Sequence, residues 1–327
     1  MHPQVSAPSR FLRVDPVLGR FKVHRSAYAD PAVFAEEKHK IFDRCWQFAG
    51  HDSEVARRGD YVLREFAGRR VILTRGQDGV VRALLNTCAH RGAQLCVEKS
   101  GNRKTFTCPY HGWVFRNTGV LADVAASSGY PEIETFNFDR SYDLQVVPRL
   151  ESRAGFWFVN FDADAVPLSD YLGAAGERLD LIAQHSAAGM EVVHGCHEYT
   201  IKANYKLLCE NSYDGYHLDS THASYVEYLA GALKGKVEID FSGKSLTLGN
   251  GHASIEVRIP VGRPIAQWIP PMGEAARAPI EAKYRELQAR LGDARADLVA
   301  HTSRNMVIFP NNVLNDQQAV LVRSIVP

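Results

Sequence analysis

The chain has 327 residues, enough for two domains or for one large domain that carries an inserted one. Its 38 lysines and arginines almost balance its 37 aspartates and glutamates, so it has no basic field for nucleic acid or an anionic membrane surface. Residues 1–14 lack the apolar core of a secretory signal, and no stretch approaches the ~20 apolar residues of a membrane span, so we expect a cytoplasmic protein.

The first half of the chain predicts one helix and then a series of strands. Asp30-Pro31 is typical of an N-cap and first helical turn, and apolar residues at helical spacing continue to about Arg44. Short β-patterns follow, at residues 61–65, 70–75, 80–86, 105–107 and 113–116. We therefore expect antiparallel β-structure from about residue 46 to residue 155.

Two short motifs stand between these strands. Cys88-x-His90 and Cys108-x2-His111 each combine one thiolate and one imidazole, on turns that contain Gly or Pro. This pattern predicts a Rieske iron–sulfur site, in which two cysteines hold one iron of a [2Fe–2S] cluster and two neutral histidines hold the other. Because the imidazoles remove negative charge, the expected reduction potential lies between about −150 and +300 mV.

A structural zinc site is the alternative, since two cysteines and two histidines are also a tetrahedral zinc set. A zinc finger usually separates its Cys pair from its His pair, whereas here each motif carries one of each. The mixed pairs favour the iron–sulfur cluster. The other four cysteines stand in no motif and are expected to be reduced and mostly buried: Cys45, Cys96, Cys196 and Cys209.

The second half alternates between strand and helix patterns. Strands are expected at residues 155–161, 192–201, 244–259, 306–310 and 319–325. Helices are expected at residues 168–184, 204–218 and 279–300, with their apolar faces in the core.

A second candidate site lies at residues 210–222. Asp214 and His217 share a helix face, but His217 and His222 diverge by about 140° on a regular helix. Both histidines reach one metal only if the helix ends or distorts between them, which Gly215 and the polar residues 219–221 permit. Two imidazoles and a carboxylate form the facial triad of non-haem Fe(II) oxygenases.

Taken alone, a histidine pair at the end of a helix is more often structural than metal-binding, and Asp214 can simply be a solvated acid. The cluster changes this interpretation, because an electron-transfer cluster needs an acceptor. Activation of O2 at Fe(II) in turn needs electrons that arrive one at a time.

Together, C-x-H-R-G, C-P-Y-H-G-W and E-N-x2-D-x2-H-x4-H resemble the motifs of the catalytic α-subunit of Rieske non-haem iron aromatic-ring-hydroxylating oxygenases, along nearly the whole chain. Four stretches look most like the benzoate, toluate and anthranilate dioxygenase branch: residues 108–119 (CPYHGWVFRNTG), 128–131 (SGYP), 167–173 (PLSDYLG) and 211–217 (NSYDGYH).

The resemblance implies that Cys88, His90, Cys108 and His111 hold the Rieske cluster, and that His217 and His222 bind a mononuclear Fe(II). Asp214 would be catalytic, with a hydrogen bond to His217 on one side and to a cluster histidine of a neighbouring subunit, His111, on the other. Asn211 matches a position that lines the iron pocket and would contact substrate, although a polar helix residue there can be structural.

The resemblance also implies an α+β fold, with an antiparallel β Rieske [2Fe–2S] domain inserted in a helix-grip (START-like) catalytic domain that has an antiparallel sheet. The expected divisions are an N-terminal helical part of the catalytic domain at 1–45, the Rieske domain at 46–155 and the mononuclear-iron domain at 156–327. The last is expected to be incomplete at its C-terminal end.

The third iron ligand is unknown. In the family it is an Asp on a helix beyond the strand that matches residues 319–325, so we expect either a fragment or an incomplete iron site. Asp316 is not a candidate, because Asn315-Asp316-Gln317 has the pattern of a hairpin turn. Arg304 and Arg323 are candidates for binding a substrate carboxylate, although a surface position is expected for each.

The implied function is that of a terminal oxygenase. Electrons from a reductase with flavin and iron–sulfur centres would pass from the cluster through Asp214 to Fe(II), and both atoms of O2 would add to a benzoate-like acid to give a cis-dihydrodiol. The implied assembly is a homotrimer, with or without a small β-subunit in an α3β3 form. The rivals are a Rieske electron carrier, an inactive fragment, or a zinc-binding interaction protein.

Overall fold

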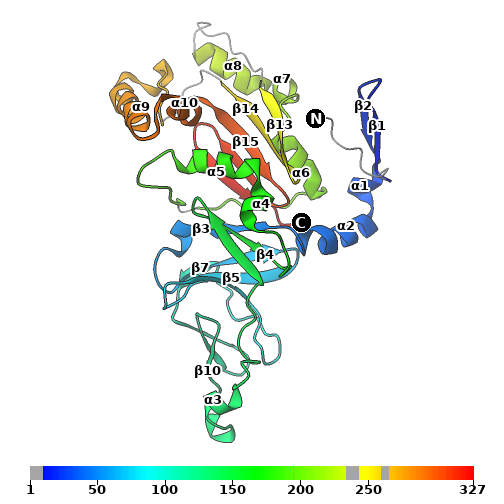
Figure 1. Ribbon diagram of the computed structural model, residues 1–327, viewed down its shortest axis with the longest axis vertical. Helices are drawn as coiled ribbons and strands as arrows, with labels where there is room; N and C mark the ends of the chain where they lie inside the picture. The colour runs from blue at the N-terminus through cyan, green and yellow to red at the C-terminus, as the bar shows by residue number, and fades with distance from the viewer. Residues whose placement is uncertain (1–9, 194, 233–242, 259–264) are drawn as a thin grey trace.

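The computed structural model describes the whole chain except residues 1–9, 194, 233–242 and 259–264. The molecule is elongated (Figure 1). One half is built mainly of short strands and ends near α3 (Ile133–Phe136), and the other half holds a five-stranded sheet with helices on both faces.

The first strands of the described residues form a hairpin of β1 (Leu12–Asp15) and β2 (Arg20–Val23), which the sequence pattern did not predict. It continues into α1 (Ser26–Ala29) and α2 (Pro31–Glu37), and a π-helical turn, Lys38–Phe42, extends α2. The predicted N-cap is confirmed, since Oδ1 of Asp30 accepts a hydrogen bond from the N–H of Ala32 at 2.9 Å.

Three antiparallel sheets make up the strand-rich half, with orders β6-β5-β4-β7, β10-β9-β8 and β11-β12-β3. Their strands are β3 (Gln47–His51), β4 (Asp60–Phe66), β5 (Arg69–Arg75), β6 (Val81–Leu85), β7 (Ser100–Asn102), β8 (Thr105–Thr107), β9 (Val114–Arg116), β10 (Leu121–Asp123), β11 (Arg149–Arg153) and β12 (Phe156–Asn160). The strands expected from the sequence between residues 61 and 116 are confirmed.

The other half is organised by an antiparallel sheet of order β13-β14-β15-β16-β17. Its strands are β13 (Lys244–Gly249), β14 (His252–Val257), β15 (Ser303–Ile308), β16 (Asn312–Asp316) and β17 (Val320–Ser324). Met306 and Leu314 pack on one face against α4 (Leu168–Leu172) and α5 (Ala174–Ala183), whereas Val307 and Val313 pack on the other against α6 (Tyr205–Ser212). The alternation of neighbouring residues between faces is the expected period of a strand.

Residues from the start of the chain pack on this second half. Phe42 shares a buried cluster with Tyr205 of α6 and with Val307 and Val313 of the sheet. The hydroxyl of Tyr28 in α1 also donates to the Glu210 carboxylate at 2.8 Å. In sequence, the strand-rich half therefore lies between two segments that pack together as one unit. The expected α+β class with antiparallel sheets is confirmed.

Several expected helices are shorter than their patterns suggested. The helix expected at 168–184 is divided into α4 and α5 by Gly173, and the one expected at 279–300 is divided by Gly292 into α9 (Arg277–Leu291) and α10 (Asp293–His301). Both glycines adopt positive φ, which ends a helix at no steric cost. The helix expected at 204–218 ends at Ser212, and the short helices α7 (Leu218–Thr221) and α8 (Ala223–Ala232) follow.

The strand expected at 192–201 was wrong, because the described residues of this segment belong to no strand. Val193 and Tyr199 are 76% and 68% exposed, so the alternating pattern has no partner strand to pair with. The four cysteines outside the motifs are free thiols as expected, but only Cys96 and Cys209 are buried, whereas Cys45 is half-buried and Cys196 is exposed.

Two expectations about charged residues were also wrong. Arg304 is not on the surface, and Asp316 is not in a turn but is the last residue of β16; both are buried and stand directly opposite each other across β15 and β16. Nη1 of Arg304 donates to Oδ2 of Asp316 at 3.2 Å, and His185 lies 3.4 Å from the same carboxylate. The opposite charges make burial of both side chains possible.

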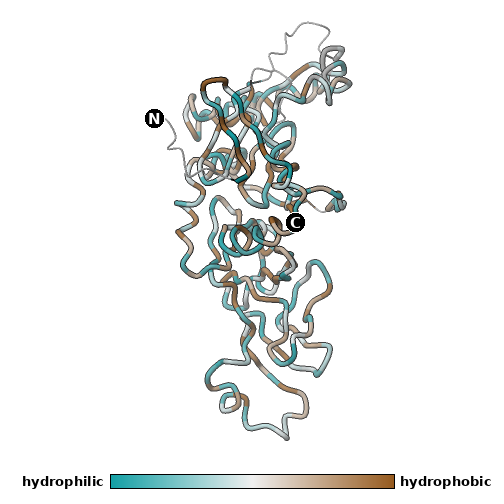
Figure 2. Tube along the Cα trace, turned by 90° about the vertical axis from the view of Figure 1, so that its right-hand side faces the viewer, coloured by the Kyte–Doolittle hydropathy of each residue, from teal (hydrophilic) through white to brown (hydrophobic). Residues whose placement is uncertain are grey.

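Polar and apolar segments interchange along the described part of the trace (Figure 2). Within the described residues, we find no helix with the length and apolar character that crossing a bilayer requires.

Candidate metal centres

Two loops with the same backbone geometry carry the first four candidate ligands. Cys88 follows β6 and Cys108 follows β8. The N–H of Cys88 donates to the Ala93 carbonyl (2.8 Å), and the N–H of Cys108 donates to the Trp113 carbonyl (2.7 Å). In return, the N–H of Gly92 donates to the Cys88 carbonyl (2.9 Å), and the N–H of Gly112 donates to the Cys108 carbonyl (3.0 Å). Gly92 and Gly112 have φ values of 73° and 67°, which glycine adopts without strain.

The two thiols are buried side by side in one cluster of the core. Cys88 and Cys108 are each 2% exposed. Burial raises the pKa of the Cys88 thiol, and the neighbouring Cys108 raises this pKa further. A bound metal cation would instead favour the deprotonated form of both cysteines, because the thiolate is the form that ligates metal.

The two imidazoles lie beside the thiols with their rings held by aromatic neighbours. The ring centroids of His90 and His111 are 4.7 Å apart; His90 stacks on Trp113 at 4.6 Å, and Tyr110 stacks on His111 at 3.7 Å. Nδ1 of His90 is buried, with no hydrogen-bond partner among the described residues. Burial lowers the pKa of His90, as does His111, so the ring is neutral and keeps a lone pair for a metal.

These donors fit a Rieske [2Fe–2S] cluster, in which each iron takes only two protein ligands. A structural zinc site would differ in taking all four donors around one ion.

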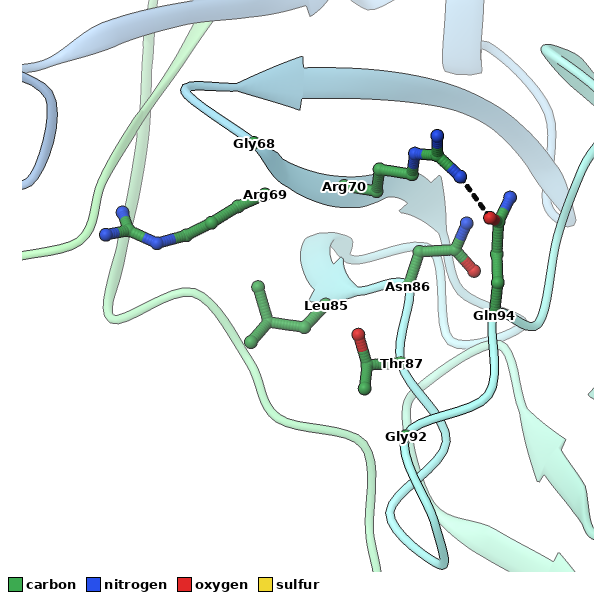
Figure 3. A pocket seen from close by; sticks show the side chains of 8 residues that line it. All are labelled: Gly68, Arg69, Arg70, Leu85, Asn86, Thr87, Gly92 and Gln94. Atoms are coloured by element: carbon green, nitrogen blue, oxygen red, sulfur yellow. Dashed lines mark hydrogen bonds between the residues drawn. The ribbon is translucent and has the colours of Figure 1, made fainter. Parts of the chain in front are cut away.

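Asn86 is a positioning residue that the sequence motifs did not reveal. Its side chain is buried beside the first loop, where Oδ1 accepts the N–H groups of Leu95 (3.1 Å) and Cys96 (2.9 Å) and Nδ2 donates to the Cys96 carbonyl (2.7 Å). Figure 3 shows Asn86 in the shallow hollow beside this loop, with Thr87, Gly92 and the hydrogen-bonded pair Arg70 and Gln94. A single carboxamide thus ties the loop to the strand β6 that precedes it.

The second site is formed where α6 stops. His217 and His222 flank the single-turn helix α7, and their Nε2 atoms lie 3.3 Å apart. Two ligand atoms at right angles around an ion, with bonds of ~2.1 Å, are about 3 Å apart. The two imidazoles therefore fit one metal ion. The helix was expected to end or distort between the two histidines, but α6 already ends at Ser212, before both of them, and the short helix α7 lies between them.

Asp214 orients the first of these histidines. Its Oδ2 lies 3.2 Å from Nδ1 of His217, and its Oδ1 accepts the N–H of Tyr216 at 2.8 Å. A carboxylate at Nδ1 holds the proton there and leaves Nε2 free for a metal. The carboxylate is still 45% exposed, so another molecule has access to it. Asn211 lies exposed on α6.

The two candidate sites are not brought together within one chain. The cluster loops belong to the half that carries β7 and β10, whereas α7 lies at the opposite end of the molecule (Figure 1). Asp214 and His111 therefore do not meet within this chain. An exposed aromatic side chain marks each site: Tyr216 is 98% and Tyr110 is 61% exposed.

Comparisons with known proteins cover both halves of the chain. Residues 45–137 match the family model of the Rieske [2Fe-2S] domain, and residues 189–327 match that of the ring hydroxylating alpha subunit (catalytic domain). The 2-halobenzoate 1,2-dioxygenase large subunit of Burkholderia cepacia is 35% identical, over 98% of this chain and 68% of that protein. The toluate 1,2-dioxygenase subunit alpha of Pseudomonas putida is 32% identical, over 91% of this chain and 65% of its own length.

A solved structure shows the same fold. Naphthalene 1,2-dioxygenase from Rhodococcus sp., bound to indole, superposes with a TM-score of 0.74 at 33% identity, over 90% of this chain and 64% of that one. The chain thus spans about two thirds of the length of these relatives.

Proposed function

The chain belongs to the α-subunits of Rieske ring-hydroxylating oxygenases, and from this premise we propose that it is a terminal oxygenase component that adds both atoms of O2 to a benzoate-like aromatic acid. The product would be a cis-dihydrodiol. Two relatives that match nearly the whole chain act, by name, on 2-halobenzoate and toluate, which supports an acid as the substrate. The observation that carries the proposal is the pair of imidazoles at His217 and His222, oriented by Asp214 at the end of α6.

The cofactors of this family are a Rieske [2Fe–2S] cluster and a mononuclear non-haem iron. When bound, the cluster supplies single electrons and the mononuclear iron supplies O2 activation. We assign Cys88, His90, Cys108 and His111 to the cluster, and His217 and His222 to the mononuclear iron. The third ligand of that iron is not assigned.

Asp214 is the residue that would couple the two centres. On one side it holds the Nδ1 proton of His217, which fixes the orientation of that ring. Its other side is exposed and suits a second imidazole N–H, for which the partner subunit's His111 is the candidate. A carboxylate between two imidazoles would keep both tautomers fixed and let the charge on one ring influence the other.

This arrangement makes the proposed enzyme an oligomer. Since the two sites lie at opposite ends of one chain, the cluster of one copy must reach the iron site of the next. A homotrimer closes such head-to-tail contacts. A reductase with flavin and iron–sulfur centres, and in an α3β3 form a small β-subunit, would complete the system. We place the divisions of the chain at residues 1–45, 46–155 and 156–327.

Product analysis tests the proposed function. The full-length protein, supplied with NADH and a reductase of this family, should take up O2 when benzoate is added and release a non-aromatic cis-dihydrodiol acid. Metal analysis should find about three irons and about two acid-labile sulfides per chain. Two irons per chain with no substrate-dependent O2 uptake would instead identify an electron carrier, and zinc without sulfide would identify a zinc-binding protein.

A further inference from the structure

One row of side chains crosses the sheet on the face that α6 covers. Register places these residues opposite one another from β13 to β17: Ser245, Ile255, Asn305, Asn315 and Leu321. Asn305 and Asn315 are each two residues from a valine, Val307 or Val313, that packs against α6, so they point to the same face as that helix.

The segment that carries the proposed iron ligands lies directly over one end of this row. Oγ of Ser245 donates to the Tyr213 carbonyl at 3.4 Å, and Cδ1 of Ile255 packs so closely on Gly215 that a Cβ there would clash. Neighbouring strands are about 4.8 Å apart, so Asn305 and Asn315 lie roughly 5 and 10 Å along the sheet from Ile255. A benzoate-sized molecule beside His217 spans that interval.

The two asparagines form a hydrogen-bonded unit whose acceptors are already used or buried. Oδ1 of Asn305 accepts from Nδ2 of Asn315 at 2.8 Å and from Nε2 of Gln317 at 3.1 Å. Oδ1 of Asn315 is buried and has no hydrogen-bond partner among the described residues. Among the described residues, Nδ2 of Asn305 has no hydrogen-bond acceptor. The unit is therefore preorganised to offer N–H donors to a ligand.

The sheet turns Arg304 away from this row. Arg304 is the chain neighbour of Asn305, but its side chain points to the opposite face and forms a buried ion pair with Asp316. The side chains of Asn305 and Asn315 therefore offer a ligand neutral N–H groups and no positive charge. A carboxylate accepts such hydrogen bonds strongly, whereas a neutral arene would leave the donors unsatisfied.

We infer that Asn305, held in place by Asn315 and Gln317, determines substrate specificity by donating its Nδ2 hydrogens to the carboxylate of an aromatic acid whose ring lies over Ile255. This inference rests on the proposed function and adds to it the group that selects an acid over a neutral arene.

The test compares benzoate with toluene in the full-length protein. Asn305→Leu removes the donor, and Asn305→Asp keeps the shape but replaces the donor with an anion. Ser254→Ala is the matched control, since Ser254 lies next to Ile255 in β14 on the opposite face. The ratio of kcat/KM for benzoate to that for toluene should fall about tenfold or more in both Asn305 variants, and more in the Asp variant, the effect expected from loss of a hydrogen bond to a charged group. It should not change in the control.

Calorimetric binding of benzoate provides the second measurement, and it should weaken in the same order. If the wild type turns over both compounds and neither Asn305 variant changes their ratio, the inference is wrong and the proposed function stands. If the wild type binds benzoate and the Asn305 variants do not, yet no protein takes up O2, the proposed function fails and the recognition stands. A wild type that does not bind benzoate overturns the recognition.

Discussion

Nε2 of His217 lies 3.3 Å from Nε2 of His222. The two residues stand at the two ends of the single-turn helix α7. Side chains five residues apart in the interior of a regular helix point about 140° away from each other. His217 and His222 instead stand just outside the two ends of α7, where His222 has left the helical conformation with φ −109° and ψ 25°.

The first prediction concerns this pair. His222→Ala should remove the mononuclear iron and leave the cluster in place, because the two sites share no residue. Iron should fall from about three to about two per chain while acid-labile sulfide and the visible spectrum stay as in the wild type. His39→Ala is a control, since His39 is an exposed histidine on the surface of the π-helical turn. Loss of sulfide in His222→Ala would contradict separate sites.

The second prediction concerns Asp214. Asp214→Asn keeps the shape of the side chain but removes the charge that holds the Nδ1 proton of His217. Both metal contents should stay near wild-type values, while turnover should fall by about a hundredfold, the upper range for loss of a partner behind a metal-bound histidine. Iron analysis and the O2-uptake rate are measured on the same preparation. Normal turnover in this variant would show that Asp214 does not couple the two metal sites.

The third prediction is about stability. Arg304→Met leaves the Asp316 carboxylate buried without the guanidinium, and it should lower the free energy of unfolding by about 3–5 kcal/mol. The control is Arg258→Met in the exposed Arg258–Asp297 pair, which should cost less than about 1 kcal/mol. Urea unfolding followed by circular dichroism measures both. Adding Asp316→Asn to Arg304→Met should recover part of the loss, and no recovery would show that the ion pair is not its source.

The fourth prediction is a pH dependence that arises at His252. This ring is buried; its Nε2 lies 2.9 Å from the Tyr171 carbonyl, and its Nδ1 accepts the N–H of Phe309 at 3.1 Å. Burial lowers the pKa of His252 below its usual value, so the unfolded chain takes up this proton at a higher pH than the folded protein does. The free energy of unfolding should therefore fall as pH drops below about 6.5.

The measurement is urea unfolding at pH 7.5 and at pH 5.5, for the wild type and for His252→Asn. Asparagine still offers an acceptor and a donor but does not titrate, so the difference between the two pH values should be smaller in the variant. If the free energy of unfolding differs by the same amount between the two pH values in both proteins, protonation of His252 is not the source of the pH dependence.

The sequence predicted what depends on short-range patterns. Cys88, His90, Cys108 and His111 stand on turns whose glycines are themselves part of the motif, and the strands around them alternate regularly. The geometry of an i, i+5 pair called for a break between His217 and His222, but it did not locate the end of α6 at Ser212. These features need no knowledge of distant contacts.

What the sequence could not show depends on pairing across the sheet. Arg304 and Asp316 are twelve residues apart and meet only because β15 and β16 are in register, so neither residue alone indicates burial. The same register creates the unit of Asn305 and Asn315. Asn86 has no motif, and its role follows only from the loop that folds back onto it.

The measurement that tests the account most directly is the activity of a mixed oligomer. Chains with Cys108→Ala, which lack the cluster, and chains with Asp214→Ala, which lack the bridge, are co-expressed with different tags, and the oligomer that carries both tags is purified. Each variant alone should be inactive, whereas the mixed oligomer should take up O2 with benzoate, because the cluster of one chain serves the iron site of the next. A mixed oligomer that contains cluster and mononuclear iron but is as inactive as its parents would contradict the account.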